Sequence, residues 1–520
     1  MNILFLNSIK QNCGVYQYGK RLFSIFCESK KIYTIYEEVS NYEDYEKCLK
    51  TYNNINGIIY NYHPLTFYWL NEYNIQRKNI NIGILHENES SLFDITFDSD
   101  CTVAEKQFKF SLPRPLAKSN VNFDVNHCKN KEFIMKYTEN HIPIFGSFGF
   151  GFFNKGFDRI IHSVNDQYDN AIIKLIITVP DYETNKQKPF IIAKALTHLP
   201  RKKGIILMIT HEFFTQDELL YFLSLNTLNI FLYDYMPGRG ISSVIDYALS
   251  VNVPIGISNS VMFRHIYNDC ICLYTSSISQ IINNVDYLNQ FKELYSDQKL
   301  ISKFESLFQI SYSQCYQDIF VMSMLQHKQG GYFVEIGSNH HKNYNNSYIL
   351  EKMYNWSGLL VEYDACFKDS YIKQRCSSIY KIGDAQALNY IELLKDFPKA
   401  IDYLQIDLDV NNKSTLNTLY NLDTHIFDNY KFATITFEHD IYSGNHFETR
   451  QKSRELFKNR GYILIFPDVC VFWEGEYRAF EDWYIHPDLV DCKYVLKNYI
   501  LTERSNANMK SEDIKNLLCA

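Results

Sequence analysis

Short apolar segments alternate with stretches of helical periodicity along the whole chain. In the first part, apolar segments occupy residues 2–6, 56–62 and 81–87, and residues 16–28 carry apolar positions at helical spacing. Strands that are apolar along their length and separated by amphipathic helices are typical of parallel sheets covered on both faces. The pattern therefore predicts an α/β fold.

A second series of the same kind begins after residues 111–119, where Pro113 and Pro115 break both helix and strand patterns. Its predicted strands are residues 143–150, 171–179, 203–210, 229–235 and 253–258. Residues 283–308 then show a helical pattern with few strand signals. This stretch is predicted to connect the second series to a third.

The third series has the features of a complete doubly wound sheet. Its predicted strands are residues 331–338, 358–364, 378–385, 402–409, 432–440 and 462–469. Together the series predict two facing Rossmann-like domains followed by a third. The predicted boundaries are 1–118 and 119–285 for the facing domains, 286–310 for the helical connector, 311–500 for the third domain and 501–520 for a C-terminal tail.

The composition excludes several classes of protein. The 520 residues are 46% hydrophobic, which suits folded domains, and a net charge of −7 without long Lys/Arg runs argues against binding to nucleic acid. Thirteen cysteines without a Cys-x-x-Cys pair predict reduced thiols, neither a disulfide framework nor a zinc knuckle. Because no apolar run is long enough for a membrane span or a cleaved leader, we expect a cytoplasmic protein, in the host cytoplasm if it is viral.

Carboxylates follow five consecutive strands of the third series. They are Glu335, Glu362, Asp384, the pair Asp407 and Asp409, and the segment 438–440. Ligands bind at the carboxyl edge of an open parallel sheet, and Gly337 would allow a close backbone approach there. Each carboxylate alone could be a helix cap or a solvated strand end, whereas the whole set favours a nucleoside-type cofactor.

The same segment resembles the FkbM-type S-adenosylmethionine-dependent methyltransferases over residues 311–491. The resemblance rests on SQCYQDIFV, YFVEIGSN, NNSYILE, NWSGLLVEYD and YLQIDLD in that order. It implies a Rossmann-like methyltransferase fold that binds S-adenosylmethionine. The implied contacts are Glu335, Gly337 and Ser338 to the cofactor, Glu362 to its ribose and Asp384 near its adenine.

The chain departs from this family at one turn. Relatives commonly have Asp-Gly just after the first glycine turn, where this chain has His340 and His341. The loss of that glycine either closes the cofactor site or widens the turn so that His340 becomes a polar contact.

Methyl transfer to a hydroxyl needs a group that accepts the hydroxyl proton, and a histidine has a suitable pKa. His439, beside Asp407, is the candidate general base, although such a histidine can also be structural. Asp407, Asp409 and Glu438 have the oxygen ligands that suit magnesium. Neighbouring strand residues point to opposite faces, however, so a metal stays optional and no metal ligand is assigned.

The two facing domains suggest a cleft for a sugar nucleotide. Lys155 precedes Gly156 at a predicted turn, and Gly240, Ser242 and Ser243 precede a helix. Backbone N–H groups and the positive dipole at the start of that helix would bind a diphosphate, and Lys155 would add a point charge. The Gly-Ser-Ser segment could equally be an ordinary helix cap.

These features resemble the GT-B glycosyltransferases of the family-four type over residues 1–285. In the first half the resemblance rests on Gly14, in the loop after the first strand, and on His86. The family usually carries two glutamates eight positions apart around the phosphate helix, and here these positions are Gly238 and Asp246. The resemblance implies a nucleotide-sugar donor as substrate.

The leading hypothesis from the sequence is therefore a glycan-modifying protein. A C-terminal domain would methylate a sugar hydroxyl with S-adenosylmethionine, and a glycosyltransferase module would use a nucleotide sugar. The expected partners are small molecules or glycans, and the oligomeric state is left open. The alternative is a catalytically inactive scaffold for glycan binding or assembly that retains both folds.

Overall fold

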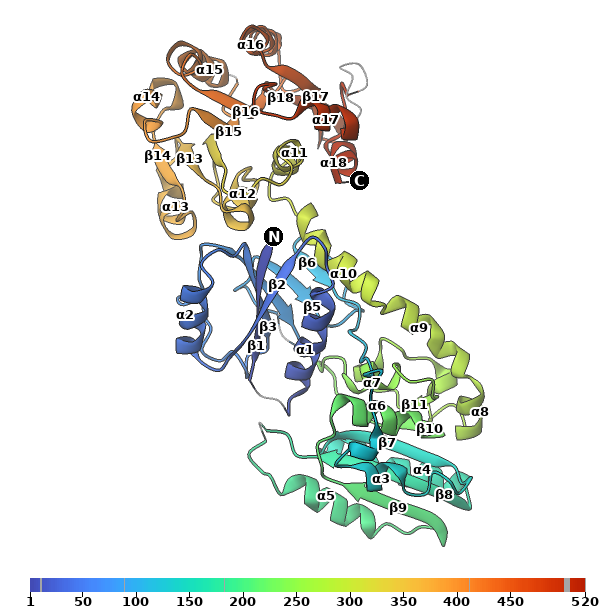
Figure 1. Ribbon diagram of the computed structural model, residues 1–520. Helices are drawn as coiled ribbons and strands as arrows, with labels where there is room; N and C mark the ends of the chain where they lie inside the picture. The colour runs from blue at the N-terminus through green and yellow to red at the C-terminus, as the bar shows by residue number, and fades with distance from the viewer. Residues whose placement is uncertain (10–11, 88, 182, 411, 500–505, 520) are drawn as a thin grey trace.

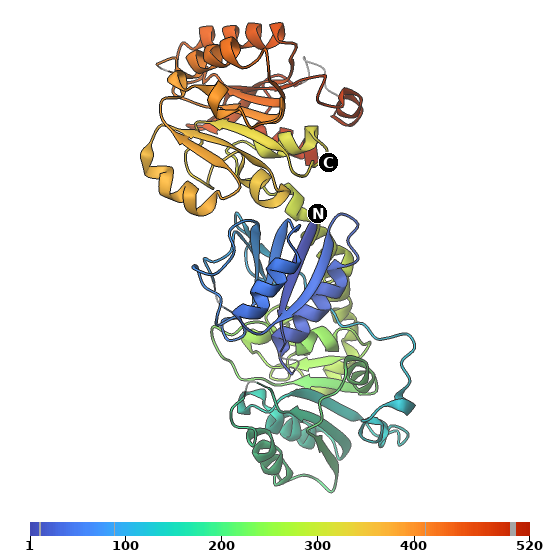
Figure 2. The same cartoon turned by 60° about the vertical axis from the view of Figure 1, so that its left-hand side comes forward.

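Three α/β units are stacked in an elongated molecule in the computed structural model (Figures 1 and 2). It describes residues 1–9, 12–87, 89–181, 183–410, 412–499 and 506–519. The N-terminal unit lies in the middle of the stack, with the second unit on one side and the C-terminal unit on the other. Each unit is built around one sheet.

The first unit has a parallel sheet of six strands in the order β2-β1-β3-β4-β5-β6. Its elements are β1 (Asn2–Ser8), α1 (Gly14–Phe26), β2 (Tyr33–Val39), α2 (Tyr42–Thr51), β3 (Gly57–Tyr62), β4 (Ile80–Leu85), β5 (Ile95–Asp98) and β6 (Lys109–Ser111). In α1 the buried side chains of Tyr18, Leu22 and Ile25 recur at helical spacing. They therefore form one apolar face of the helix, and this face packs against the core.

Three strands of this sheet were not predicted. β2 contains Glu37 and Glu38 and is mostly half-buried, while β5 and β6 are four and three residues long. β2 and β6 lie at the two edges of the sheet. Edge strands need not be apolar along their length, so their sequences lack the signal that identified the central strands.

The second unit has a parallel sheet in the order β11-β10-β7-β8-β9. Its strands are β7 (Ile144–Phe150), β8 (Asn170–Thr178), β9 (Gly204–Thr210), β10 (Leu228–Phe231) and β11 (Ile255–Ile257). Its α-helices are α3 (Lys131–Met135), α4 (Phe157–Gln167), α5 (Lys188–Thr197), α6 (Gln216–Ser224), α7 (Val244–Ala248) and α8 (Ile278–Asn283). Its 3₁₀ turns are η1 (Val125–His127), η2 (Phe153–Lys155), η3 (Val261–Phe263) and η4 (Asp269–Ile271).

The predicted connector is helical, and it packs against the first unit. It contains η5 (Val285–Leu288), α9 (Asn289–Leu294), α10 (Asp297–Glu305) and η6 (Ser306–Gln309), which run back from the second unit past the first (Figure 1). Phe304 of α10 stacks on Phe26 of α1, with ring centroids 3.9 Å apart and an interplanar angle of 5°. The connector therefore contributes to the core of the first unit.

The third unit has seven strands in the order β14-β13-β12-β15-β16-β18-β17. They are β12 (Tyr332–Ile336), β13 (Ser357–Glu362), β14 (Ile379–Ile382), β15 (Ala400–Ile406), β16 (Lys431–Glu438), β17 (Ile463–Trp473) and β18 (Glu476–Ile485). The expected sheet of six strands is thus corrected by β18, which inserts antiparallel between β16 and β17. The first half of β18 is polar and exposed, so its sequence lacks the apolar pattern that predicts a strand.

The helices of the third unit separate its strands. They are α11 (Gln317–Met324), α12 (Tyr348–Tyr354), α13 (Lys368–Gln374), α14 (Tyr390–Leu393), α15 (Ser414–His425), α16 (Phe447–Asn459), α17 (Cys492–Tyr499) and α18 (Ser511–Cys519), with 3₁₀ turns η7 (Ala365–Phe367) and η8 (Ala385–Ala387). The strand order changes direction between β12 and β15. Ligands of doubly wound sheets bind at this switch point.

The expected C-terminal tail is partly a structural element. Within it, residues 501–505 and 520 lie outside the described residues, but α18 packs against α11 and β17. Ile514 and Leu518 are buried, and Lys510 forms an isolated bridge with Cys470. The end of the chain therefore completes the third unit.

Among the described residues, no helix combines the length and the apolar character that crossing a membrane requires.

Candidate functional site

One cavity of about 700 Å³ lies between the first and second units. Residues from both units line it, and they include every residue that the sequence assigned to a nucleotide sugar: Gly14, His86, Lys155, Gly240, Ser242 and Ser243. The structure thus brings together side chains that are far apart in the sequence.

The two walls of this cleft approach closely at two glycines. A Cβ atom on Gly14, at the start of α1, would lie 3.5 Å from Ser243 Oγ on the opposite wall. A Cβ on Gly240 would lie only 2.5 Å from the carbonyl oxygen of His86. Only glycine therefore fits at position 240 without moving one unit away from the other.

Lys155 is held at the turn that the sequence predicted. Gly156 adopts a left-handed conformation with φ of 61°, and a Cβ there would lie 1.9 Å from Leu232 O. Lys155 Nζ lies 3.7 Å from the ring centroid of Tyr233. Burial, and secondarily the charge of Arg239, lower the pKa of Lys155 to about 7. An anion bound beside this lysine would favour its charged form.

The segment before α7 differs from the expected row of free backbone donors. The Ser242 N–H group donates to Met262 O at 3.0 Å, so it is not available to a ligand. The helix is only five residues long, and Ser243 makes no side-chain cap hydrogen bond. The positive charge at this wall comes instead from Lys155 and Arg239, both of which line the cavity.

His86 is fixed in one tautomer by its neighbours. Its Nε2 lies 2.7 Å from Asn61 Oδ1, and the Asn61 amide nitrogen donates to Asn7 Oδ1 and to Val15 O, each at 2.8 Å. Because these bonds orient the Asn61 amide, His86 Nε2 must donate and its Nδ1 carries the lone pair. Burial lowers the pKa of His86 to about 3, aided by the charges of Arg114 and His63.

Two further groups on the wall of the first unit were missed in the sequence. Glu87 Oε1 lies 3.1 Å from Arg239 Nε of the second unit, and Glu87 Oε2 lies 3.8 Å from His63 Nε2. His63 directly follows the strand predicted at 56–62, and Glu87 is the last residue of the strand predicted at 81–87. Their position after buried parallel strands was the signal that could have identified them.

Asp246, at the position of the second family glutamate, is fully buried and is not among the residues that line the described cavity. It forms ion pairs with Arg21 at 2.8 Å and with Arg114 at 2.7 Å. Arg21 belongs to α1 and Arg114 to the proline-containing segment. This carboxylate therefore joins the two units.

In the third unit, Gly337 and Ser338 lie at the switch point. Gly337 has a φ of 88°, and a Cβ there would be 1.7 Å from Asp407 O. The close approach that requires this glycine is thus to the end of β15. Ser338 is buried, and its hydroxyl contacts Val361 O at 3.2 Å and the Tyr371 hydroxyl at 3.0 Å.

The three acidic residues assigned to the cofactor have different surroundings. Glu335 is fully buried and accepts hydrogen bonds from Asn345, Asn346 and Ser347. Asp384 is exposed, and its side chain caps η8 by accepting a hydrogen bond from Gln386 N at 3.0 Å. A helix cap was one of the alternatives that the sequence left open for each of these carboxylates.

Glu362 is half-buried and lies at the end of β13. Its Oε1 accepts from the N–H groups of Tyr363 and Asp364 at 2.8 and 2.9 Å, and its Oε2 accepts from Asn339 N at 2.7 Å. Since a carboxylate oxygen can accept two hydrogen bonds, Oε2 has room for one more donor.

A second carboxylate accompanies Asp407 at this edge. Burial raises the pKa of Asp407 to about 7, and the charges of Asp440, Glu335 and Glu362 contribute. Burial also raises the pKa of Asp440 to about 6. Asp440 has a φ of 46°, a conformation that non-glycine residues rarely adopt. Two carboxyl groups with raised pKa values thus follow β15 and β16.

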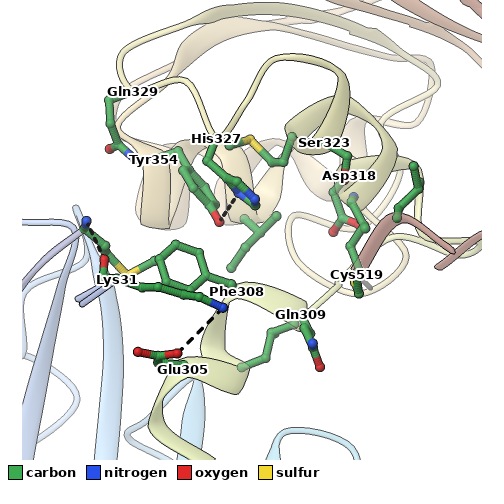
Figure 3. Close-up of a pocket in the computed structure, with 16 residues that line it drawn as sticks. Lys31, Glu305, Phe308, Gln309, Asp318, Ser323, His327, Gln329, Tyr354 and Cys519 are labelled. Atoms are coloured by element: carbon green, nitrogen blue, oxygen red, sulfur yellow. Dashed lines mark hydrogen bonds and ion pairs between the residues drawn. The ribbon is translucent and has the colours of Figure 1, made fainter. Parts of the chain in front are cut away.

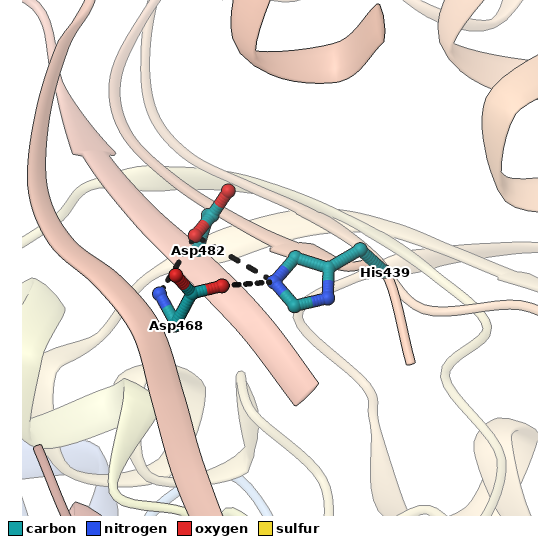
Figure 4. Close-up of side chains that lie close together, drawn as sticks. All are labelled: His439, Asp468 and Asp482. Atoms are coloured by element: carbon teal, nitrogen blue, oxygen red, sulfur yellow. Dashed lines mark hydrogen bonds and ion pairs between the residues drawn. The ribbon is translucent and has the colours of Figure 1, made fainter. Parts of the chain in front are cut away.

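The structure corrects the expected placement of His439 beside Asp407. Its side chain is fully buried, and Nε2 lies 3.5 Å from Asp468 Oδ1 and 3.6 Å from Asp482 Oδ1 (Figure 4). Asp440, the next residue, is the one that acts electrostatically on Asp407. β16 ends at Glu438, and the N–H groups of His439 and Asp440 both donate to Phe480 O, so the regular alternation of the strand stops before these two residues.

His439, Asp468 and Asp482 form the one group of potential metal ligands found in the described part of the chain, within 4.8 Å of one another. Both carboxylates are already bound by Arg454, at 2.9 Å from Asp468 and 2.6 Å from Asp482. This arginine, with Arg450 on Asp468, makes the group an ion-pair network. The suggested set of Asp407, Asp409 and Glu438 is not among the groups that the described residues form.

A second cavity, of about 430 Å³, lies at the junction of the first unit, the connector and the third unit (Figure 3). His327 Nδ1 lies 3.4 Å from the Tyr354 hydroxyl, and Lys31 pairs with Glu305 at 3.6 Å. None of the site residues predicted from the sequence lines this cavity as described.

Among solved structures, the chain is similar to HepE from Anabaena in complex with UDP-glucose, with a TM-score of 0.42 and 10% identity over 59% of this chain and 99% of that one. It is also similar to the lipopolysaccharide outer core galactosyltransferase WaaB, with a TM-score of 0.39 and 10% identity over 59% and 98% of the two chains. An alpha-glucosyltransferase in complex with UDP and a 13-mer DNA gives a TM-score of 0.33 and 13% identity over 60% and 95%.

No protein-family model and no curated protein matches the chain.

Proposed function

We propose that the first two units bind a nucleoside diphosphate sugar in the cleft between them and transfer the sugar. The observation that carries this proposal is the gathering of Lys155, Arg239 and His86 on the walls of one cavity. Two cations on one wall suit a diphosphate, and a neutral histidine on the other suits a sugar hydroxyl.

The proposed roles follow from the contacts of each group. Lys155 and Arg239 bind the diphosphate and stabilise the negative charge that develops when the bond to the sugar breaks. When the donor enters, Arg239 releases Glu87 and binds the diphosphate in its place. His86 presents its Nδ1 lone pair to a donor or acceptor hydroxyl, because Asn61 occupies its Nε2 proton.

Isothermal titration of the full chain with UDP-glucose and GDP-mannose tests this function. We expect one of them to bind and Lys155→Met to weaken binding at least tenfold. Lys202→Met is the matched control, since Lys202 is an exposed lysine of the same unit paired with Asp169. Failure of both nucleotides to bind would contradict the proposal.

We further infer that the third unit is an S-adenosylmethionine-dependent methyltransferase acting on a sugar hydroxyl. The observation in its favour is Asp407 at the switch point beside Gly337, with Asp440 at the end of the next strand acting on it electrostatically. When bound, the cofactor would supply a methyl group on a positively charged sulfur. These carboxylates suit that charge, and Glu362 Oε2 suits a ribose hydroxyl.

In this proposal Asp440 takes the role that the sequence gave to His439. Its pKa of about 6 leaves it ionised at neutral pH, so it accepts the proton of the attacking hydroxyl. Asp407, whose pKa burial raises to about 7, lies at the end of the neighbouring strand. His439 stabilises the end of β16 through its contacts with Asp468 and Asp482.

Binding of S-adenosylhomocysteine to the full chain, measured by titration, tests the third unit without needing an acceptor. We expect Glu362→Ala to weaken binding and Asp396→Asn, an exposed carboxylate of the same unit, to leave it unchanged. No binding by the folded wild-type chain would contradict this function.

One observation favours the alternative of a catalytically inactive scaffold. Gly238 supplies no carboxylate to the cleft, and Asp246 is sequestered by arginines. If nucleotide sugars bind but no sugar is released to water or to any offered acceptor, the non-catalytic scaffold becomes the better account.

A further inference from the structure

The loop after β12 lies between the first unit and the proposed cofactor site of the third. We call residues 339–347 the docking loop. It begins next to Ser338 and contains His340 and His341, where the sequence departs from the methyltransferase pattern. Its first residue, Asn339, donates its N–H group to Glu362 Oε2 at 2.7 Å. The loop is therefore bonded to the carboxylate proposed to bind the ribose.

The far end of the docking loop is fixed inside the third unit. Asn345 Nδ2 donates to Glu335 Oε2 at 3.1 Å and to Ser338 O at 3.0 Å. Arg375 donates to Asn345 Oδ1 at 2.8 Å and to His341 O at 3.3 Å. These bonds close the loop at its base and leave its middle to project toward the first unit.

The middle of the loop is held by a residue of the first unit. Lys342 Nζ lies 2.9 Å from Asp94 Oδ1, and the hydroxyl of Tyr348, just after the loop, donates to the same oxygen at 2.7 Å. Asp94 Oδ2 accepts from Asn81 N of β4 at 2.9 Å. The Asp94 side chain is 12% exposed, so the ion pair is largely shielded from water.

Aromatic side chains enclose this ion pair. Phe108 of the first unit stacks on Tyr312, with ring centroids 4.1 Å apart and an interplanar angle of 9°. The Tyr312 hydroxyl donates to Asp94 O at 2.9 Å, and Lys342 Nζ lies 5.4 Å from the Tyr312 ring centroid. The contact is thus a packed interface in which Asp94 is the central charge.

The loop holds two residues in left-handed conformations, Asn339 with φ of 48° and Tyr344 with φ of 56°. Such conformations are unfavourable for a tyrosine and persist when surrounding contacts over-determine them. The contacts to Asp94 are among those that hold the loop in this form.

We propose that Asp94 of the first unit is a positioning residue for the cofactor site of the third unit. It holds Lys342 and Tyr348, and through them it sets the path of the docking loop and the bond from Asn339 to Glu362. The departure from the methyltransferase pattern at His340 and His341 then lies in a loop that reaches the first unit. This inference rests on the proposed binding of S-adenosylmethionine by the third unit.

The test uses the full chain and two measurements. The first is the affinity for S-adenosylhomocysteine by titration, and the second is hydrogen exchange of the amides of residues 339–347. We expect Asp94→Asn and Lys342→Met each to raise Kd at least tenfold and to speed exchange in the loop. The double variant should be no worse than Asp94→Asn alone, because that variant has already lost the ion pair with Lys342.

Gln329→Ala is the matched control, since Gln329 bonds Asn56 across the same interface at 2.6 Å but lies outside the loop. It should leave both measurements unchanged, and UDP-glucose affinity should be unchanged in every variant. Unaltered loop exchange in Asp94→Asn would overturn the anchoring. Faster exchange with unaltered Kd would overturn the positioning role of Asp94 toward the cofactor site. Absence of binding by the wild-type chain would remove the proposed function instead, while the exchange data would still report on the anchor.

Discussion

Arg114 and Asp246 form a bidentate ion pair at the junction of the first two units. Arg114 Nε lies 2.8 Å from Asp246 Oδ1, and its Nη2 lies 2.7 Å from Oδ2. The exposed fractions of the two side chains are 2% and 0%. Arg21 adds a third bond to the same carboxylate at 2.8 Å. A single acidic side chain thus pairs with two buried arginines.

Asp246→Asn should destabilise the protein by about 3–5 kcal/mol, because it leaves two buried guanidinium groups with no counter-charge. Urea denaturation monitored by tryptophan fluorescence measures the change. Asp234→Asn is the control, since Asp234 pairs with Arg159 at the surface and should cost less than about 1 kcal/mol. Equal losses in the two variants would contradict this account.

Binding of UDP-glucose should weaken as the pH rises above 7. Lys155 has a pKa of about 7 in the free protein, so above that pH it must take up a proton to bind the diphosphate in its charged form. The affinity should fall by up to tenfold per pH unit. Titrations in buffers of different ionisation enthalpy would detect the proton uptake, and Lys155→Met should abolish it.

Gly337→Ala should destabilise the third unit far more than Gly475→Ala does. Both glycines have positive φ, but a Cβ on Gly337 would lie 1.7 Å from Asp407 O, whereas a Cβ on Gly475 would have nothing within 4 Å. Conformational strain alone predicts about 1 kcal/mol at Gly475. At Gly337 we expect at least about 3 kcal/mol by thermal denaturation, with loss of S-adenosylhomocysteine binding.

Asp440→Asn should stabilise the protein at pH 7.5 while abolishing methyl transfer. The pKa of Asp440 is raised to about 6, so the folded state loses stability as the pH rises from about 4 to 6 and the carboxyl must ionise. The amide removes this penalty. The melting temperature should therefore exceed that of the wild type at pH 7.5 and match it near pH 4. A lower melting temperature at pH 7.5 would argue against an unfavourable charge at this position.

The central strands of each sheet could be predicted because they are buried on both faces. β1, β3 and β4 in the first unit and β12, β13, β15 and β16 in the third all coincide with predicted segments. β2, β6 and β18 could not, because edge or antiparallel strands expose polar positions to water. Sequence periodicity reports burial, and these strands are only partly buried.

Several residues that line the candidate cleft could also be predicted from the sequence. Gly14, His86 and Lys155 follow strands at the carboxyl edge of parallel sheets, and the structure gathers them on one cavity. The residues that these side chains contact could not be predicted. Asn61 fixes the tautomer of His86 because β3 pairs beside β4, and Arg239 reaches Glu87 across the cleft. Neither strand pairing nor the approach of two units has a periodic signal in the sequence.

By itself, the sequence determined the α/β class, the alternation of strands and helices, and the polar residues that follow buried strands. These are local properties, since the burial of a strand and the end of a strand are both visible in neighbouring residues. Tertiary structure alone decided that His439 pairs with Asp468 and Asp482, that Asp246 joins two units, and that Asp94 contacts a loop of the third. Such pairings join residues far apart in the chain, and the packing of separate units fixes them.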